Sequence, residues 1–297
     1  MTDPTDVFAH LSEGLSEGRY EELSSLYAED TLVEHPTAVP RPGRLAGRQA
    51  VHDRFTGGLG AAIRLKAHDA VVHETTDPEV IVAEYQSTVE SPDTGRSTEA
   101  ANILVIRARD GLLVHTRDYH DYLKLAAVRG GAELLADAYE QAPAHVPGPV
   151  TPRPEALADR KSPLGVFQRL CFGVSDDRWS ELPDLYAERT DVSHPFLPNA
   201  PTLNTRDELR THFARVGELG LRLQATDLVT YQSADPEVII GEFAYEGEFE
   251  SRPFRVNDIL VLRVRDGRIV ESRDYSDHLA LAAASGRLPE LIAALNV

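Results

Sequence analysis

Two aspartates stand at equivalent places in two similar segments, DGLLVHTRDY and DGRIVESRDY. Side chains alternate between the two faces of a β-strand, so Asp118 is expected to share a face with Val114 and Thr116. Asp274 shares the equivalent face with Val270. This face carries small and apolar residues and is the better candidate for the interior. A carboxyl group in an apolar cavity has a raised pKa and can act as a general base or acid near neutral pH.

The same two aspartates have a structural alternative. The RDY motif could form a corner in which the aspartate caps a helix that begins around Tyr122 or His278. The residues alone leave catalysis and capping open.

A histidine followed by proline ends the first strand expected in each copy, at His35 and His194. In the first copy, Thr31, Val33 and His35 would share one face. Histidine titrates near neutral pH, so it could move a proton or donate a hydrogen bond to a developing oxyanion. The alternative is a structural histidine in both copies.

Two further pairs of polar residues recur in later strands. Asn102 and Asp258 each lie on an apolar face of the expected strand, where a polar side chain needs a hydrogen-bond partner. Glu84 and Glu242 belong to a strand whose two faces are almost equally apolar. We expect a solvated or sheet-edge position for these glutamates.

The remaining histidines form no linear metal-binding motif such as HExxH. They are His10, His52, His68, His73, His115, His120, His145, His212 and His278. The sequence also contains no glycine-rich phosphate loop and no CxxC pair. We therefore expect neither a metal nor another cofactor.

An internal repeat organises the chain. LYAEDTLVEHP returns as LYAERTDVSHP, and DAVVHETTDPEVIVAEY returns as DLVTYQSADPEVIIGEF, in the same order. A length of 297 residues also suits two domains of common size. Proline density favours extended chain between the copies. We predict domains at 1–140 and 163–297, joined by a proline-rich linker at 141–162.

Apolar residues at helical spacing predict two helices at the start of each copy. These residues are Phe8, Leu11 and Leu15, then Leu23, Leu26 and Tyr27, repeated as Phe167, Leu170 and Val174, then Trp179, Leu182 and Leu185. Thr5 is the expected N-cap of the first helix. A third helix follows the first strand and carries Val51, Phe55 and Leu59, or Leu209, Phe213 and Val216.

The second part of each copy is rich in β-strands. Asp110-Gly111 and Asp266-Gly267 each lie between two such segments and predict hairpins. Helices that precede a run of antiparallel strands indicate an α+β fold. We expect a tandem repeat of two cone-shaped α+β barrels, each with three N-terminal helices packed on a curved, mainly antiparallel sheet.

Composition limits the possible partners and compartment. The formal charge of −18 comes from 48 acidic and 30 basic residues, so the average field repels nucleic acid and anionic membranes. No apolar run approaches the roughly 20 residues that span a bilayer. Cys171 is the single cysteine, and the first residues lack the pattern of a secretory signal. We expect a soluble, cytoplasmic protein.

These motifs resemble the SnoaL-like polyketide cyclases and the wider nuclear-transport-factor-2-like superfamily, which includes the ketosteroid isomerases. The resemblance covers both copies and leaves out the linker. It implies that the carboxylate of the closing hairpin, Asp118 or Asp274, acts as acid or base. His35 and His194 stand where ketosteroid isomerases carry an aspartate base, which disfavours steroid isomerisation. Asp258 resembles their protonated oxyanion-hole aspartate.

The resemblance implies a cofactor-independent acid/base enzyme of secondary metabolism, such as a cyclase, isomerase or dehydratase, acting on a small hydrophobic, polyketide-like molecule. The alternatives are an epoxide hydrolase or a non-catalytic small-molecule binding or scaffold protein. Family members pair through their sheets, so the two copies would form an intramolecular pseudo-dimer, with further oligomerisation open.

The expected site residues fall into two sets. The catalytic set pairs Asp274 with His194 and Asp258 in the second copy, and Asp118 with His35 in the first. Asn102, Tyr186 and Tyr27 would bind substrate. The second copy is expected to carry the chemistry, because Asp258 adds a second carboxyl group there.

Overall fold

The computed structural model describes residues 3–59, 62–148, 150 and 152–295. The chain divides into two compact units, Met1–Ala142 together with Ile292–Val297, and Pro143–Leu291. Each unit contains one six-stranded sheet and its own helices. The change of unit after residue 142 falls inside the proline-rich segment.

The first sheet has the strand order β2-β1-β6-β5-β4-β3. β1 and β6 run parallel, and the other neighbouring strands are antiparallel. The described elements of this unit are α1 (Pro4–Glu17), α2 (Tyr20–Leu23), η1 (Ser24–Leu26), β1 (Tyr27–His35), β2 (Gly43–Ala46), α3 (Arg48–Asp53), η2 (Arg54–Leu59), β3 (Arg64–Glu74), β4 (Val80–Glu90), β5 (Ser97–Arg109), β6 (Leu112–His120), α5 (Tyr122–Val128) and α6 (Leu134–Gln141).

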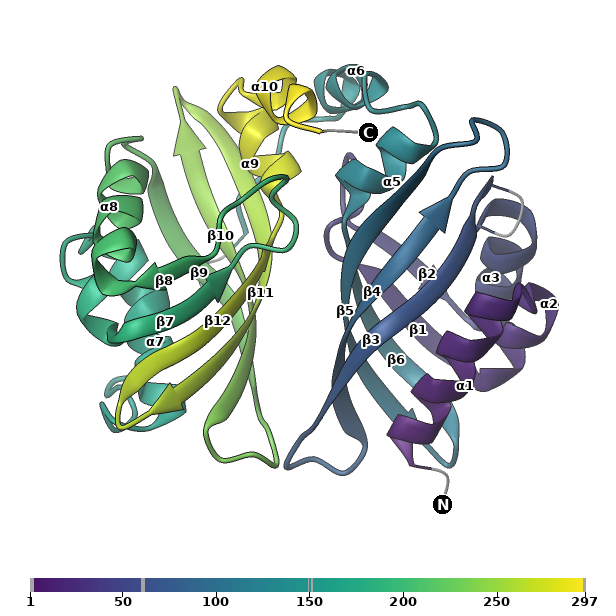
Figure 1. Ribbon diagram of the computed structural model, residues 1–297, viewed down its shortest axis with the longest axis horizontal. Helices are drawn as coiled ribbons and strands as arrows, with labels where there is room; N and C mark the ends of the chain where they lie inside the picture. Colours follow the sequence, from purple (N-terminus) through teal and green to yellow (C-terminus); the bar gives the residue numbers. More distant parts are fainter. Residues whose placement is uncertain (1–2, 60–61, 149, 151, 296–297) are drawn as a thin grey trace. The chain divides into compact units, whose positions relative to one another are not determined.

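The second sheet repeats this order as β8-β7-β12-β11-β10-β9, again with one parallel pair, β7 and β12. Its unit is built from α7 (Pro163–Ser175), η3 (Leu182–Leu185), β7 (Tyr186–Ser193), β8 (Leu203–Thr205), α8 (Arg206–Gly217), β9 (Arg222–Gln232), β10 (Val238–Phe249), β11 (Arg252–Arg265), β12 (Arg268–Ser276), α9 (His278–Ala284) and the greater part of α10 (Leu288–Ala293). The predicted tandem α+β architecture is confirmed (Figure 1).

The first helix of each unit covers its sheet with an apolar face. Asp3 caps α1 by accepting a hydrogen bond from the Thr5 backbone N–H, so the N-cap predicted at Thr5 is wrong by two residues. Ser162 caps α7 in the same way. α1 and α7 have 14 and 13 residues, and no described helix is both long and apolar enough to cross a membrane.

The second helical segment is shorter than the apolar spacing indicates. In the first unit it consists of α2 and η1, and in the second it is the single 3₁₀ turn η3. Tyr27 and Tyr186 therefore begin strands β1 and β7, although Tyr27 has helical spacing in the sequence. Arg48 and Arg206 donate hydrogen bonds to the carbonyls of these tyrosines, which ties the third helix to the strand.

The closing hairpins form where Asp-Gly pairs predict them. Asp110 and Gly111 have φ values of 52° and 78°, and Asp266 and Gly267 have 52° and 73°. A two-residue hairpin turn with positive φ at both positions matches the twist of the flanking strands. The first turn joins the strands of Asn102 and Asp118, and the second joins those of Asp258 and Asp274.

Beyond Gln141, the last residue of α6, the proline-rich segment contains no described helix or strand, but part of it packs on the second unit. Arg153 forms an ion pair with Asp176 at 2.7 Å, and its guanidinium lies 4.9 Å from the centre of the Phe172 ring. The Gln168 side chain accepts a hydrogen bond from the Ala158 backbone N–H. These contacts hold the segment against α7.

The core of each unit lies between its first helix and its sheet. In the second unit, Phe167 of α7 is fully buried against Gly241 of β10. A Cβ atom at Gly241 would lie 2.0 Å from this ring. The first unit has Ala83 at the corresponding place, so the two cores differ in packing although their sequences align.

We predict that Gly241→Ala destabilises the protein by about 1–3 kcal/mol, because the added methyl group overpacks the core around Phe167. Urea unfolding followed by circular dichroism measures the effect. Gly57→Ala is the control, since a Cβ there meets nothing within 4 Å. Equal losses in the two variants would contradict this account of the core.

Candidate functional site

The first unit encloses a cavity of about 90 Å³ between its helices and its sheet. Most of the lining is apolar and includes Leu11, Phe55 and Leu104. Its polar groups come from the four neighbouring strands β1, β6, β5 and β4 and from the helices. They are Tyr27, His35, Arg54, Tyr85, Ser87, Asn102, Asp118, His120 and Tyr122. The cavity is large enough for several water molecules, or for part of a small organic molecule.

Strand register brings the central polar groups together. Val33 of β1 lies opposite Thr116 of β6 in the parallel pair, and the next residues on the same face of these strands are His35 and Asp118. His120 follows Asp118 at the same period, and its antiparallel neighbour on β5 is Asn102. Four polar side chains from three strands thus enter one cavity.

A β-bulge in β6 changes which residues face inward, so the face predicted from the sequence is partly wrong. The register between β5 and β6 shifts so that Val114 has no partner, and Leu113 is fully buried in the core. Val114 therefore does not share the inward face of Asp118, although Thr116 does. The same shift occurs at Val270 in the second unit. Asp118 still points inward, as predicted. The buried apolar residue that precedes it on this side of the strand is Leu113, however, and not Val114.

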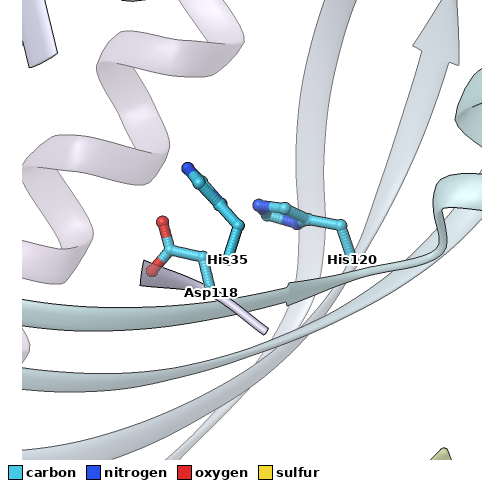
Figure 2. Close-up of side chains that lie close together, drawn as sticks. All are labelled: His35, Asp118 and His120. Carbon is cyan, nitrogen blue, oxygen red and sulfur yellow. The ribbon is translucent and has the colours of Figure 1, made fainter. Parts of the chain in front are cut away.

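His35, Asp118 and His120 point toward one another in Figure 2, and each offers a nitrogen or oxygen atom within 4.8 Å of the others. Both ring nitrogens of His35 are buried, and neither has a hydrogen-bond partner among the described residues. Oδ1 of Asp118 is also buried without one. Unsatisfied buried polar atoms are costly, so these groups are poised to bind something that enters the cavity.

Hydrogen bonds fix the orientation and tautomer of His120. The Asn102 amide Nδ2 donates to the backbone carbonyl of Ala100 and to the Ser87 hydroxyl, both at 3.0 Å. The Asn102 oxygen must then face His120 and accept a hydrogen bond from its Nδ1–H at 2.7 Å. The other ring nitrogen, Nε2, keeps its lone pair. Asn102 is therefore a positioning residue for His120.

Burial controls the protonation of all three groups. It raises the pKa of Asp118 to about 7. It lowers the pKa of His35 to about 4, with a smaller contribution from Arg54. Burial, followed by the charges of His35 and Arg54, lowers the pKa of His120 to about 3. At neutral pH the site contains two neutral imidazoles and a carboxyl group that can readily gain or lose a proton.

The helix-capping role considered for the aspartate of the RDY motif belongs to other aspartates. Asp121 accepts a hydrogen bond from the Lys124 backbone N–H, and Asp277 accepts one from Ala280, so these residues cap α5 and α9. Asp118 lies three residues earlier and lines the cavity.

The charge of Asp118 acts on two buried tyrosines. Tyr27, predicted as a substrate-binding residue, lines the cavity, and Tyr85 lines it as well. Burial and then the Asp118 charge raise the pKa of both phenols, so both remain protonated at neutral pH. Their hydroxyl groups can serve only as neutral hydrogen-bonding groups there.

The equivalent strands of the second unit carry a different set of polar residues. Asp274 lies opposite Leu260, two residues from Asp258 on β11, and each aspartate has one buried oxygen without a hydrogen-bond partner. Burial raises the pKa of Asp274 to about 7. Burial and the Asp274 charge raise the pKa of Asp258 well above its ordinary value. Burial and their mutual repulsion therefore favour a proton on this pair of carboxyl groups.

In the second unit His194 takes the place of His35, and it lies in a cluster of three histidines. The His194 ring centre lies 5.2 Å from that of His212 and 6.3 Å from that of His278. Burial lowers the pKa of His194, and it lowers those of His212 and His278 to about 4 and about 3. Tyr186, predicted as a substrate-binding residue, is buried at the start of β7.

The structure adds residues that sequence reasoning missed. His120 could have been found by extending the period of two from Asp118 by one more step. His212 and His278 had no such signal, because they reach His194 from separate helices. The three-dimensional cluster of His35, Asp118 and His120 is also chemically suited to a divalent cation, which a search for linear motifs does not reveal.

The position expected for Glu84 and Glu242 is wrong. Both are buried, with exposed fractions of 5% and 1%, and their strands β4 and β10 are internal in their sheets. Glu84 is hydrogen-bonded to His73 at 2.7 Å, and Glu242 accepts a hydrogen bond from the Tyr231 hydroxyl at 2.6 Å. Polar partners therefore compensate the burial of both carboxylates.

The SnoaL-like domain family matches the chain twice, over residues 8–116 and 167–272. The chain therefore belongs to this family and contains two copies of its domain. A relative from Bacillus subtilis strain 168, the uncharacterized protein YesE, is 30% identical over 116 residues. That match covers 38% of this chain and 78% of the relative.

Solved structures with a similar fold each match part of the chain. A candidate isomerase from Bacillus subtilis is 26% identical, with a TM-score of 0.41, and covers 43% of this chain and 92% of its own. A candidate polyketide cyclase from Xanthomonas campestris is 19% identical, with a TM-score of 0.38, and covers 42% and 96%. RV0760c from Mycobacterium tuberculosis, in complex with estradiol-17beta-hemisuccinate, is 19% identical, with a TM-score of 0.35, and covers 39% and 92%.

We predict that Asp118→Asn stabilises the folded protein at pH 8. The folded pKa of Asp118 is raised, so its contribution to stability is fully present below about pH 4 and is lost as the pH rises to about 7. One pKa unit corresponds to about 1.4 kcal/mol, so the gain is of the order of a few kcal/mol. Urea unfolding of both proteins between pH 4 and 8 measures it. A difference that does not change with pH would contradict the burial of this carboxyl group.

We also predict that His120 remains a neutral Nδ1–H imidazole from pH 5 to pH 8, because burial disfavours its charge and Asn102 accepts its Nδ1 proton. ¹⁵N NMR of the ring nitrogens distinguishes this tautomer from the Nε2–H form. Asn102→Ala should produce a mixture of tautomers. An Nε2–H ring in the unaltered protein would show that the proposed orientation is wrong.

Proposed function

We propose that the first unit is an enzyme that transfers protons on a small hydrophobic molecule containing a carbonyl group, as an isomerase, cyclase or dehydratase. The observation that carries this proposal is the buried carboxyl group of Asp118. It enters an apolar cavity beside two neutral imidazoles and has an oxygen without a partner. Family membership supports a small-molecule function of this kind.

The proposed first step is removal of a proton from the carbon next to the carbonyl. The Asp118 carboxylate takes the proton, the C–H electron pair becomes part of a C–C double bond, and the carbonyl oxygen becomes an enolate. Within the described part of the chain His35 has no partner at either ring nitrogen, so its N–H can donate a hydrogen bond to that oxygen. The apolar lining excludes water and strengthens this interaction.

The group that next receives the proton from Asp118 determines which product forms. Its return to a different carbon gives an isomer. Attack of the enolate carbon on a second carbonyl gives a ring, with the proton passing to the new alkoxide. Loss of a hydroxyl group from the adjacent carbon, protonated as it leaves as water, gives a dehydrated product. The lone pair on His120 Nε2 can accept a hydrogen bond from a substrate hydroxyl in each case.

The second unit carries the same chemistry in a different form under this proposal. Asp274 would serve as the base, Asp258 as a protonated hydrogen-bond donor, and His194 as a further polar group. The greater activity expected there from the sequence stays a prediction. The cavity lined by Asp118 supports a site in the first unit.

The test uses 2-tetralone, a small bicyclic ketone with exchangeable protons next to its carbonyl. ¹H NMR in deuterated water measures their exchange with the unaltered protein, Asp118→Asn and Asp274→Asn. We expect acceleration over buffer, and Asp118→Asn should lower it by about 100-fold or more, the usual contribution of a general base. Asp274→Asn is the matched control, because it removes the equivalent carboxyl group of the other unit.

Each contrary result has a distinct meaning. A larger loss in Asp274→Asn would place the principal chemistry in the second unit. Binding of 2-tetralone without faster exchange would indicate a non-catalytic binding protein. Stoichiometric metal in the purified protein, with activity abolished by a chelator, would contradict proton transfer by Asp118 alone.

A further inference from the structure

Arg54 places a positive charge at the cavity of the first unit. It is the first residue of η2 and belongs to the cavity lining, together with His35 and His120. Its charge contributes to the lowered pKa of both histidines, so the guanidinium lies near the proposed reaction site. The side chain itself is exposed, which leaves its donors accessible from solvent.

This arginine has no acidic partner within the part of the chain that the structure describes. Many other arginines are paired: Arg107 and Arg109 bind Glu79, and Arg263 and Arg265 bind Glu237. The chain has 48 acidic residues and a net charge of −18. An unpaired arginine beside an apolar cavity stands out against this composition and can bind an external anion.

The second unit lacks this charge at the equivalent position. Arg48 and Arg206 correspond, because each donates a hydrogen bond to the carbonyl of the tyrosine that starts its strand. Six residues further along each helical segment stand Arg54 and His212. Burial lowers the pKa of His212 to about 4, so this residue is neutral at pH 7.

A second difference between the two units also makes the second site less favourable for an anion. The second unit has the carboxyl group of Asp258 where the first has the neutral amide of Asn102. The first site therefore combines one carboxyl group with one cation, whereas the second has two carboxyl groups and a neutral histidine at the corresponding positions. The two sites therefore differ in the charge of their polar side chains.

We infer that the first unit takes small hydrophobic substrates that carry a carboxylate or a similar anionic group, and that Arg54 binds this group at the cavity while the apolar part of the substrate reaches Asp118. The inference rests on the proposed function of the same cavity and adds the class of substrate. A local cation is needed because the overall negative charge of the protein repels anions. The guanidinium can form two parallel hydrogen bonds with a carboxylate.

Equilibrium binding of 2-naphthoate and 2-naphthol tests the inference. The two probes share a bicyclic body, but only the first is an anion at neutral pH. Calorimetry at low ionic strength should show tighter binding of 2-naphthoate. Arg54→Gln should weaken it by roughly five- to tenfold and leave 2-naphthol within about twofold, since the lost interaction is a partly exposed charge pair. Arg54→Lys should retain part of the preference.

Arg44→Gln is the matched control. Arg44 is an exposed arginine on β2, the same strand as the cavity residue Leu45, but it does not belong to the cavity lining. Its substitution should change neither affinity, whereas an equal effect in the two variants would indicate a general change of charge. Equal affinity of the unaltered protein for both probes, or no binding of 2-naphthoate, would overturn the inference. Equal loss of both probes in Arg54→Gln would indicate a structural role and would also overturn it.

Asp118→Asn separates this inference from the proposed function. It should lower proton exchange in 2-tetralone by about 100-fold or more and keep the preference for 2-naphthoate, because Arg54 is unchanged. Selective binding without exchange in the unaltered protein would contradict only the proposed enzyme. Exchange without selective binding would contradict only the role of Arg54.

Discussion

The parallel pairing of β1 with β6 is the contact on which the site of the first unit depends. β1 comes from the start of the domain and β6 from its end, and their register sets Val33 against Thr116. That register places His35 next to Asp118 on the inward face. A slip by one residue would turn one of the two side chains to the other face of the sheet. The helices and hairpins hold this one register.

Burial then gives the paired residues their chemistry. An exposed carboxyl group is ionised at neutral pH and is a weak base, whereas the apolar lining raises the pKa of Asp118 to about 7. The same burial keeps His35 and His120 neutral. These unsatisfied groups lower the stability of the folded protein, and a bound substrate can supply the partners they lack. The apolar core of the unit must offset that loss.

The two copies preserve the fold and differ inside it. Both retain the strand order, the parallel pair, the closing hairpin and its bulge. Among the residues that line the cavity of the first unit, Asn102 corresponds to Asp258 and Arg54 to His212. Such changes alter charge and hydrogen bonding without altering the pattern of apolar residues that specifies the sheet. Duplication can therefore supply two sites of different selectivity on one scaffold.

The sequence by itself determined the repeat, the α+β class, the hairpins and the inward direction of Asp118, because helical spacing, alternation and Asp-Gly turns are local signals. Only the tertiary structure decided what surrounds Asp118. A bulge moved Val114 out of register, and His35 came from a strand more than 80 residues away. Asn102 fixed the tautomer of His120 across a strand pair. These relations depend on register between distant segments and on burial, and neither is encoded in the spacing of neighbouring residues.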